Sequence, residues 1–124
     1  MRQKILIADD EPNIVISLEY LMKREGYTVL VARDGQEALD TIARERPDLV
    51  LLDVMMPKKN GFEVCQAVRA NEELQATKIL MLTAKGRDTD LAKGLALGAN
   101  AYMTKPFSTR ELVQKVAEML GKQP

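Results

Sequence analysis

Short aliphatic runs alternate with longer segments of mixed polar and apolar residues along the whole chain. The runs recur roughly every 20–30 residues, which is the spacing of βα units. They occupy residues 5–8, 28–32, 49–52, 79–82 and 101–103. The central three are nearly continuous in apolar residues, as is typical of parallel strands covered on both faces. The pattern predicts five strands, each followed by a helix.

The segments between the runs carry apolar residues at helical spacing. The beginnings of three helices are indicated by Asp34, Asn60 and Ser108, each followed three positions later by a glutamate, which is the spacing of a capping box. Pro12 suits the first turn of another helix. Right-handed crossovers then predict an α/β fold: a doubly wound (βα)5 parallel sheet with two helices on one face and three on the other. At this length we expect residues 1–124 to form a single domain.

Composition excludes several classes of function. Lys plus Arg and Asp plus Glu each number 18, so the net charge is zero, which argues against a strongly basic nucleic-acid or membrane-surface binder. The chain has no histidine, which excludes His-dependent catalysis and His-ligated zinc, and its single Cys65 cannot form an internal disulfide. No apolar stretch approaches the roughly 18 residues of a membrane span. We therefore expect a cytoplasmic protein.

Polar residues stand where the predicted strands end, and ligands of open parallel sheets bind beyond those ends. They are Asp9, Asp10, Glu11, Asp53, Thr83 and Lys105. Taken singly, Asp10 and Glu11 suit a helix start, Thr83 a strand end or helix cap, and Lys105 a solvated charge. Asp53 is different, because it follows the most apolar run of the chain and is more typical of a site than of a cap.

Together these residues indicate a site for a cation and a phosphoryl group. Carboxylates held close together raise one another's pKa unless a cation joins them, and an all-oxygen site suits Mg2+. Lys105 and Thr83 would donate hydrogen bonds to phosphoryl oxygens, and an aspartate can itself attack phosphorus to form an acyl phosphate. The chain has no phosphate-binding glycine loop, so a tightly held nucleotide is not expected.

The chain resembles the receiver domain of bacterial two-component response regulators, chemotaxis receivers included, from Ile5 to about Leu120. The matching segments, taken in order, are residues 5–11 (ILIADDE), 47–57 (PDLVLLDVMMP), 60–61 (NG), 82–84 (LTA), 98–99 (GA) and 102–107 (YMTKPF). The resemblance implies a flavodoxin-like fold with strand order 2-1-3-4-5. It also implies a phosphorylatable signalling switch.

The resemblance also implies a role for each matching residue. Asp53 would be the phosphoacceptor. Mg2+ would be held by the side chains of Asp10 and Asp53 and the Met55 backbone carbonyl, with Asp9 acting through water. Thr83 and Lys105 would bind the phosphoryl group, Tyr102 would be the switch aromatic, and the Lys105–Pro106 bond would be cis.

The implied partner is a sensor histidine kinase or a phosphotransfer protein, with a small phosphodonor as another source of the phosphoryl group. Phosphorylation would change the face formed by helix 4, strand 5 and helix 5 and so regulate an output such as transcription, with a phosphorylation-dependent homodimer as one expected form. This domain would bind no nucleic acid directly. It would be no enzyme beyond slow hydrolysis of its own aspartyl phosphate.

The sequence departs from one large subfamily, the winged-helix transcription factors. There two acids precede the aromatic residue of the fifth strand, whereas here Asn100 and Ala101 precede Tyr102, and Leu91 stands where a basic residue is usual. These departures put the salt bridges of that subfamily's active dimer in question.

Two other functions remain as alternatives. Haloacid-dehalogenase-like phosphatases also use an aspartate nucleophile with Mg2+, Thr and Lys, but their nucleophile lies in a DxD element after the first strand, where this chain has Asp9-Asp10-Glu11. A flavodoxin-like cofactor binder would carry a Thr/Ser-rich loop at that position instead of acids.

Overall fold

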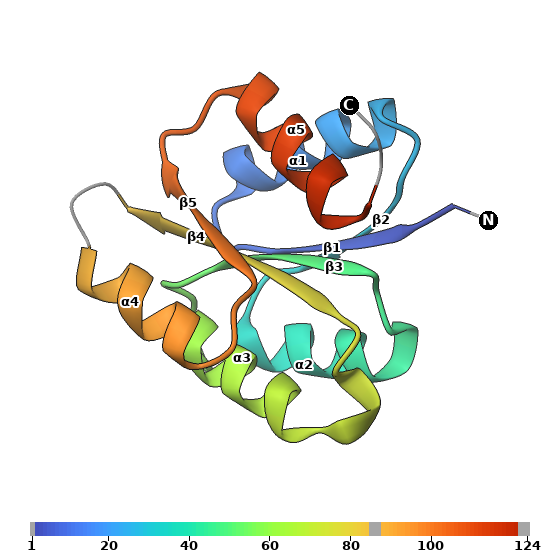
Figure 1. The fold of residues 1–124 in the computed structure, drawn as a ribbon. Coiled ribbons are helices and arrows are strands. Elements are labelled where there is room, and N and C mark those ends of the chain that lie inside the picture. The colour runs from blue at the N-terminus through green and yellow to red at the C-terminus, as the bar shows by residue number, and fades with distance from the viewer. Residues whose placement is uncertain (1, 85–87, 122–124) are drawn as a thin grey trace.

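Five strands form one parallel sheet in the order β2-β1-β3-β4-β5, as shown in Figure 1. The structure is a computed structural model and describes residues 2–84 and 88–121. The strands are β1 (Lys4–Ala8), β2 (Thr28–Ala32), β3 (Leu49–Asp53), β4 (Lys78–Ala84) and β5 (Ala101–Lys105). Every neighbouring pair is parallel, so the predicted sheet and strand order are confirmed.

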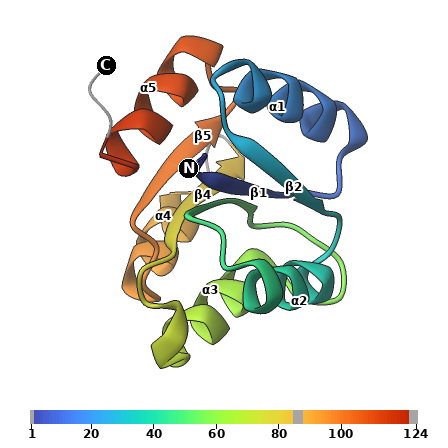
Figure 2. The ribbon, with the colours of Figure 1, turned by 90° about the vertical axis from the view of Figure 1, so that its right-hand side faces the viewer.

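Helices cover both faces of the sheet. They are α1 (Pro12–Arg24), α2 (Gly35–Glu45), α3 (Gly61–Ala70), α4 (Asp88–Ala96) and α5 (Thr109–Met119), with a 3-10 turn η1 (Glu72–Leu74) after α3. Figure 2, which looks along the sheet, shows α1 and α5 on one face and α2, α3 and α4 on the other. This is the predicted division into two and three helices. Within the described residues, no helix has the length and apolar character needed to cross a bilayer.

Alternation along the strands divides the core into two layers. In β1, Ile5 and Ile7 pack on the side of α1 and α5, whereas Leu6 and Ala8 pack on the side of α2 and α3. The same alternation runs through β3 and β4, whose apolar residues are almost wholly buried except Ala84 at the end of β4. The near-continuous apolar runs in the sequence follow from this two-sided burial.

The helix starts confirm the spacing seen in the sequence. Asn60 and Glu63 form a complete capping box before α3, with Glu63 N donating to Asn60 Oδ1 at 2.9 Å and Asn60 N donating to Glu63 Oε1 at 3.0 Å. Asp34 accepts from Glu37 N at 2.8 Å before α2. Ser108 accepts from Glu111 N at 3.0 Å before α5.

Arg69, near the end of α3, joins elements that are far apart in the chain. Its guanidinium donates to Gly98 O at 2.8 Å, Thr77 O at 2.8 Å and Asn100 Oδ1 at 2.7 Å, with a longer bond to Leu74 O at 3.4 Å. Asn100 Oδ1 also accepts from Ile79 N at 2.8 Å. The arginine therefore holds α3, the start of β4 and the start of β5 together.

Three strands continue further than their apolar runs. Asp53 is the last residue of β3, opposite Leu82, and Lys105 is the last residue of β5, opposite Ala84. Thr83 lies inside β4. Backbone pairing extends past the apolar residues, so these polar side chains project from the sheet itself and not from the loops that follow it.

Candidate functional site

The strand period places three charged residues on one side of the sheet edge. Asp9, Asp53 and Lys105 each follow by two positions a residue that packs toward α1 and α5, namely Ile7, Leu51 and Met103. Side chains two residues apart project to the same side of a strand. Ala8 lies opposite Leu52 in the β1–β3 register, so Asp9 and Asp53 come next to each other where the two strands end.

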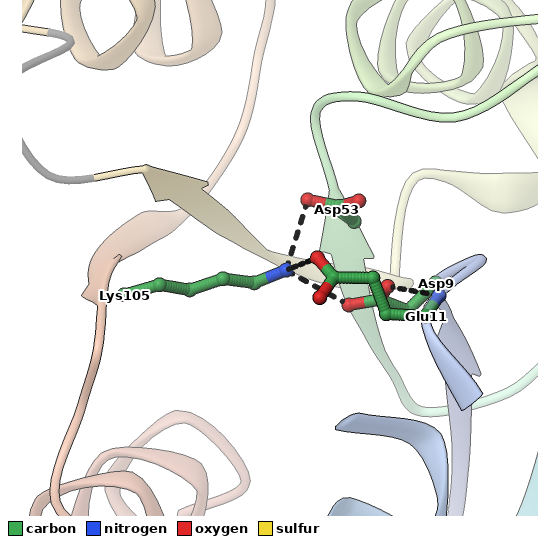
Figure 3. Close-up of polar contacts among 4 residues, drawn as sticks. All are labelled: Asp9, Glu11, Asp53 and Lys105. Atoms are coloured by element: carbon green, nitrogen blue, oxygen red, sulfur yellow. Dashed lines mark hydrogen bonds and ion pairs between the residues drawn. The ribbon is translucent and has the colours of Figure 1, made fainter. Parts of the chain in front are cut away.

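The Lys105 side chain reaches from β5 to these carboxylates, as Figure 3 shows. Its Nζ donates to Asp9 Oδ2 at 3.0 Å and to Asp53 Oδ1 at 3.2 Å, and lies 3.5 Å from Glu11 Oε1. The side chains of Asp9 and Asp53 are 0% and 7% exposed, and that of Lys105 is 17% exposed. One ammonium therefore pairs with two buried carboxylates at once.

The electrostatic balance of the cluster favours an added cation. Burial and the negative charge of Asp9 raise the pKa of Asp53 from 3.8 to about 6, although Lys105 opposes the change. Burial lowers the pKa of the Lys105 ammonium, but the charges of Asp53 and Asp9 outweigh burial and leave that pKa above its ordinary value. A carboxyl whose pKa is raised by burial and like charge gains from a nearby positive ion.

Three carboxylates are close enough to share a metal ion. Asp9, Asp10 and Asp53 each offer an oxygen, and these oxygens lie within 4.8 Å of one another. Asp9 and Asp53 are buried and Asp10 is exposed, so the group opens toward solvent on one side. Hard oxygen donors of this kind, with room for water, fit Mg2+. The donor set therefore suits the metal that the sequence predicted.

Thr83 lies on the neighbouring strand and has a hydroxyl in need of a partner. In the described part of the chain, Thr83 Oγ1 is the fully buried side-chain polar atom that has no hydrogen bond, and the residue is 1% exposed. A buried polar group left unpaired costs about 1–3 kcal/mol. A ligand oxygen beside the end of β3 would satisfy it.

The other predicted residues lie around this cluster. Met55 follows Asp53 by two positions in the loop between β3 and α3, and the residue is 60% exposed. Tyr102, in β5 opposite Met81, is 42% exposed. The Lys105–Pro106 peptide bond is cis.

Sequence reasoning grouped Glu11 with the polar strand ends but gave it no role beyond the helix start, so its contact with Lys105 was not predicted. Glu11 does stand just before α1, and its backbone N donates to Asp9 Oδ1 at 3.0 Å. Its carboxylate nevertheless reaches toward the ammonium that pairs with Asp9 and Asp53. The run of three acids directly after a strand was the available signal.

Comparison with known proteins agrees with this geometry. A family model described as the response regulator receiver domain matches residues 5–117. A solved structure of a candidate response regulator from Chloroflexus aurantiacus is 36% identical, with a TM-score of 0.94 over 98% of this chain and 100% of that chain. A chemotaxis response regulator of Vibrio cholerae is 34% identical, with a TM-score of 0.90 over 96% of this chain and 99% of that chain.

A third structure bears on the metal. The receiver domain of a sensor histidine kinase from Pseudomonas aeruginosa is 30% identical, with a TM-score of 0.90 over 98% of this chain and 100% of that chain, and it has a magnesium ion coordinated in its active-site cleft. The family model and the similar structures match nearly the whole length of the chain. The chain belongs to the response regulator receiver domain family of two-component signalling.

Proposed function

We propose that this chain is a signalling switch that accepts a phosphoryl group on Asp53. The observation that carries the proposal is the setting of Asp53: a buried carboxylate at the end of β3, bonded to the Lys105 ammonium and grouped with Asp9 and Asp10. The donor would be a phosphohistidine on a sensor histidine kinase or phosphotransfer protein, or a small phosphodonor. Residues 1–124 would act as a single receiver domain in the cytoplasm.

Mg2+ is the proposed cofactor. The side chains of Asp10 and Asp53 and the Met55 carbonyl would hold it, with Asp9 acting through water. When bound, the ion supplies positive charge that offsets the charge developing on the transferring phosphoryl group. The oxygen donors and the raised pKa of Asp53 support this assignment.

The transfer itself uses side chains of this chain. An oxygen of Asp53 attacks phosphorus, the bond between phosphorus and the donor's leaving atom breaks, and an acyl phosphate forms on Asp53. Lys105 then exchanges part of its pairing with the carboxylates for the phosphoryl oxygens, and Thr83 donates its unpaired hydroxyl. Slow hydrolysis of this acyl phosphate would be the only reaction the chain completes.

Two new charge-assisted hydrogen bonds would bias the switch. At about 1.5–3 kcal/mol each they contribute on the order of 3–6 kcal/mol before the cost of rearrangement. A change from a 1:99 to a 99:1 population needs about 5.5 kcal/mol. Phosphorylation would therefore move only part of the population of the free domain into the switched conformation. In that conformation Tyr102 would adopt another rotamer on the α4–β5–α5 face. A partner or homodimer would complete the change and pass it to an output such as transcription, without nucleic-acid contact by this domain.

Intact mass spectrometry tests the proposal directly. After incubation with acetyl phosphate and MgCl2, wild type should gain one phosphoryl group, and Asp53→Asn should gain none. Asp40→Asn is the matched control, because Asp40 is an exposed aspartate of α2 whose carboxylate accepts a bond from Gln36. An adduct that persists in Asp53→Asn would overturn the assignment. Sustained turnover of varied phosphate esters would favour the phosphatase alternative instead.

A further inference from the structure

The loop between β3 and α3, residues 54–60, is closed tightly onto the end of β3. Gly61 N donates to Val54 O at 2.8 Å. A Cβ on Gly61 would lie 2.5 Å from Asp53 O and 2.9 Å from Val54 Cα, so the missing side chain permits this approach. The start of α3 thus holds the beginning of the loop.

The far part of the same loop rests on a second helix. Gly35, the first residue of α2, donates its N–H to Pro57 O at 3.3 Å. A Cβ on Gly35 would overlap the Lys59 carbonyl and lie 2.6 Å from Lys59 Cβ. The overlapped atoms are mostly backbone, which cannot rotate away as the end of a flexible side chain would.

Met55 lies between these two contacts. The residue is 60% exposed, so packing of its side chain does little to fix its backbone. The next residue, Met56, is buried in the core. The segment Pro57–Lys59 that follows it contacts the start of α2 through the hydrogen bond from Gly35 N to Pro57 O. The position of the Met55 carbonyl therefore depends on backbone contacts at both ends of the loop.

A charge pair accompanies the second contact but is weak. Lys58 has a positive φ of 68° and its Nζ lies 3.6 Å from Asp34 Oδ2. The Lys58 side chain is 68% exposed, and an exposed pair of this kind contributes about 0–1 kcal/mol. The close backbone approach at Gly35, with its hydrogen bond to Pro57 O, is therefore the contact on which we base the inference.

We propose that Gly35 is a positioning residue for the metal site. By having no side chain, it lets the start of α2 close against Pro57–Lys59 and so fixes the Met55 carbonyl where it can bind the cation. The inference rests on the proposed function, which assigns that carbonyl to Mg2+. It places a determinant of Mg2+ affinity on an element that contributes no ligand.

The decisive measurement is the dissociation constant for Mg2+, obtained by titrating MgCl2 into isotopically labelled protein and following amide NMR signals. Gly35→Ala should weaken Mg2+ binding by about tenfold, as is usual when support around a metal ligand is removed. Thermal unfolding without metal verifies that the variant is folded. An unchanged dissociation constant in folded Gly35→Ala would overturn the proposal.

Two control variants separate the backbone contact from other causes. Gln36→Ala changes the next, exposed residue of α2, and Lys58→Gln removes the charge pair but keeps the loop backbone. Both should stay within about twofold of wild type, in keeping with the small worth of exposed contacts. A Lys58→Gln effect as large as that of Gly35→Ala would assign the role to the charge pair and contradict the proposal.

Wild type provides a test that needs no variant, in case Gly35→Ala does not fold. The amide signals of Gly35 and Lys59 should shift during the titration with the same dissociation constant as those of residues 53–55. A Gly35 signal that stays fixed while those of residues 53–55 move would contradict the coupling. Failure of wild type to bind Mg2+ at all would instead sink the proposed function, so the two failures are distinguishable.

Discussion

Lys105 Nζ lies 3.2 Å from Asp53 Oδ1, although 52 positions separate the two residues in the chain. The same ammonium bonds Asp9, so one positive charge serves two buried carboxylates, with Asp10 and Glu11 close by. The pKa of Asp53 remains raised to about 6 despite this bond. Without a metal ion, the site therefore has less positive charge than its carboxylates can pair with.

Mg2+ binding should weaken as the pH falls below about 6. In the metal-free protein Asp53 is half protonated near its raised pKa of about 6, and a proton on Asp53 must leave before the carboxylate can bind a cation. Below that pH, each unit should weaken binding by about tenfold, because one proton is displaced. Titrations at several pH values check this, and an affinity that is flat between about pH 4.5 and 7.5 would contradict it.

The stability of the metal-free protein should change with pH in the opposite direction to its Mg2+ affinity. Because the pKa of Asp53 in the folded state is raised from its ordinary value of 3.8 to about 6, the folded state binds more protons between about pH 4 and 6. The free energy of unfolding therefore falls as the pH rises through that window, by up to about 3 kcal/mol. Urea unfolding at several pH values should show this decrease in the Asp40→Asn control but not in Asp53→Asn.

Thr83→Val should separate stability from signalling. The variant removes a buried hydroxyl that has no partner among the described residues, so the metal-free fold should keep its stability or gain about 1 kcal/mol. The phosphorylated protein should lose a donor to the phosphoryl group and populate the switched conformation less. Urea unfolding and amide NMR spectra with a phosphoryl analogue measure the two effects. A marked loss of stability without metal would show that the hydroxyl has a structural role.

Arg69→Met should destabilise the fold by about 2–4 kcal/mol, because it leaves partly buried carbonyl acceptors without their charged donor. Arg69→Lys should fall between wild type and Arg69→Met, since one ammonium cannot reproduce the branched guanidinium. Arg44→Met, at an exposed arginine of α2 paired with Glu45, should change stability by less than about 0.5 kcal/mol. Denaturant unfolding ranks the three, and equal losses at both positions would contradict the assignment.

The sheet and its site edge were predictable because each rests on a local pattern. Aliphatic runs such as 49–52 mark buried strands, and parallel topology then brings Asp9, Asp53 and Lys105 to one edge. The capping residues Asn60 and Ser108 gave the helix starts for the same reason.

Contacts between distant loops could not be predicted in this way. The approach of Gly35 to Lys59 depends on how two connections meet after the sheet has formed, and no periodicity records it. The hydrogen bonds of Arg69 to Gly98 and Asn100 are of the same kind, since only the folded sheet brings these residues together. The short η1 turn, with Asn71 accepting from Glu73 N, lacks the length needed for a periodic signal.

The acceptors of Arg69 are three peptide carbonyls and an asparagine amide oxygen, all of them electrically neutral. None of these groups takes up a proton as a carboxylate does, so mild acidification leaves the hydrogen bonds of Arg69 unchanged. Protonation of the carboxylates at the strand ends therefore does not affect the hydrogen bonds of Arg69. A mildly acidified protein should lose its affinity for cations but keep its fold, and cation binding should return when the pH is raised again.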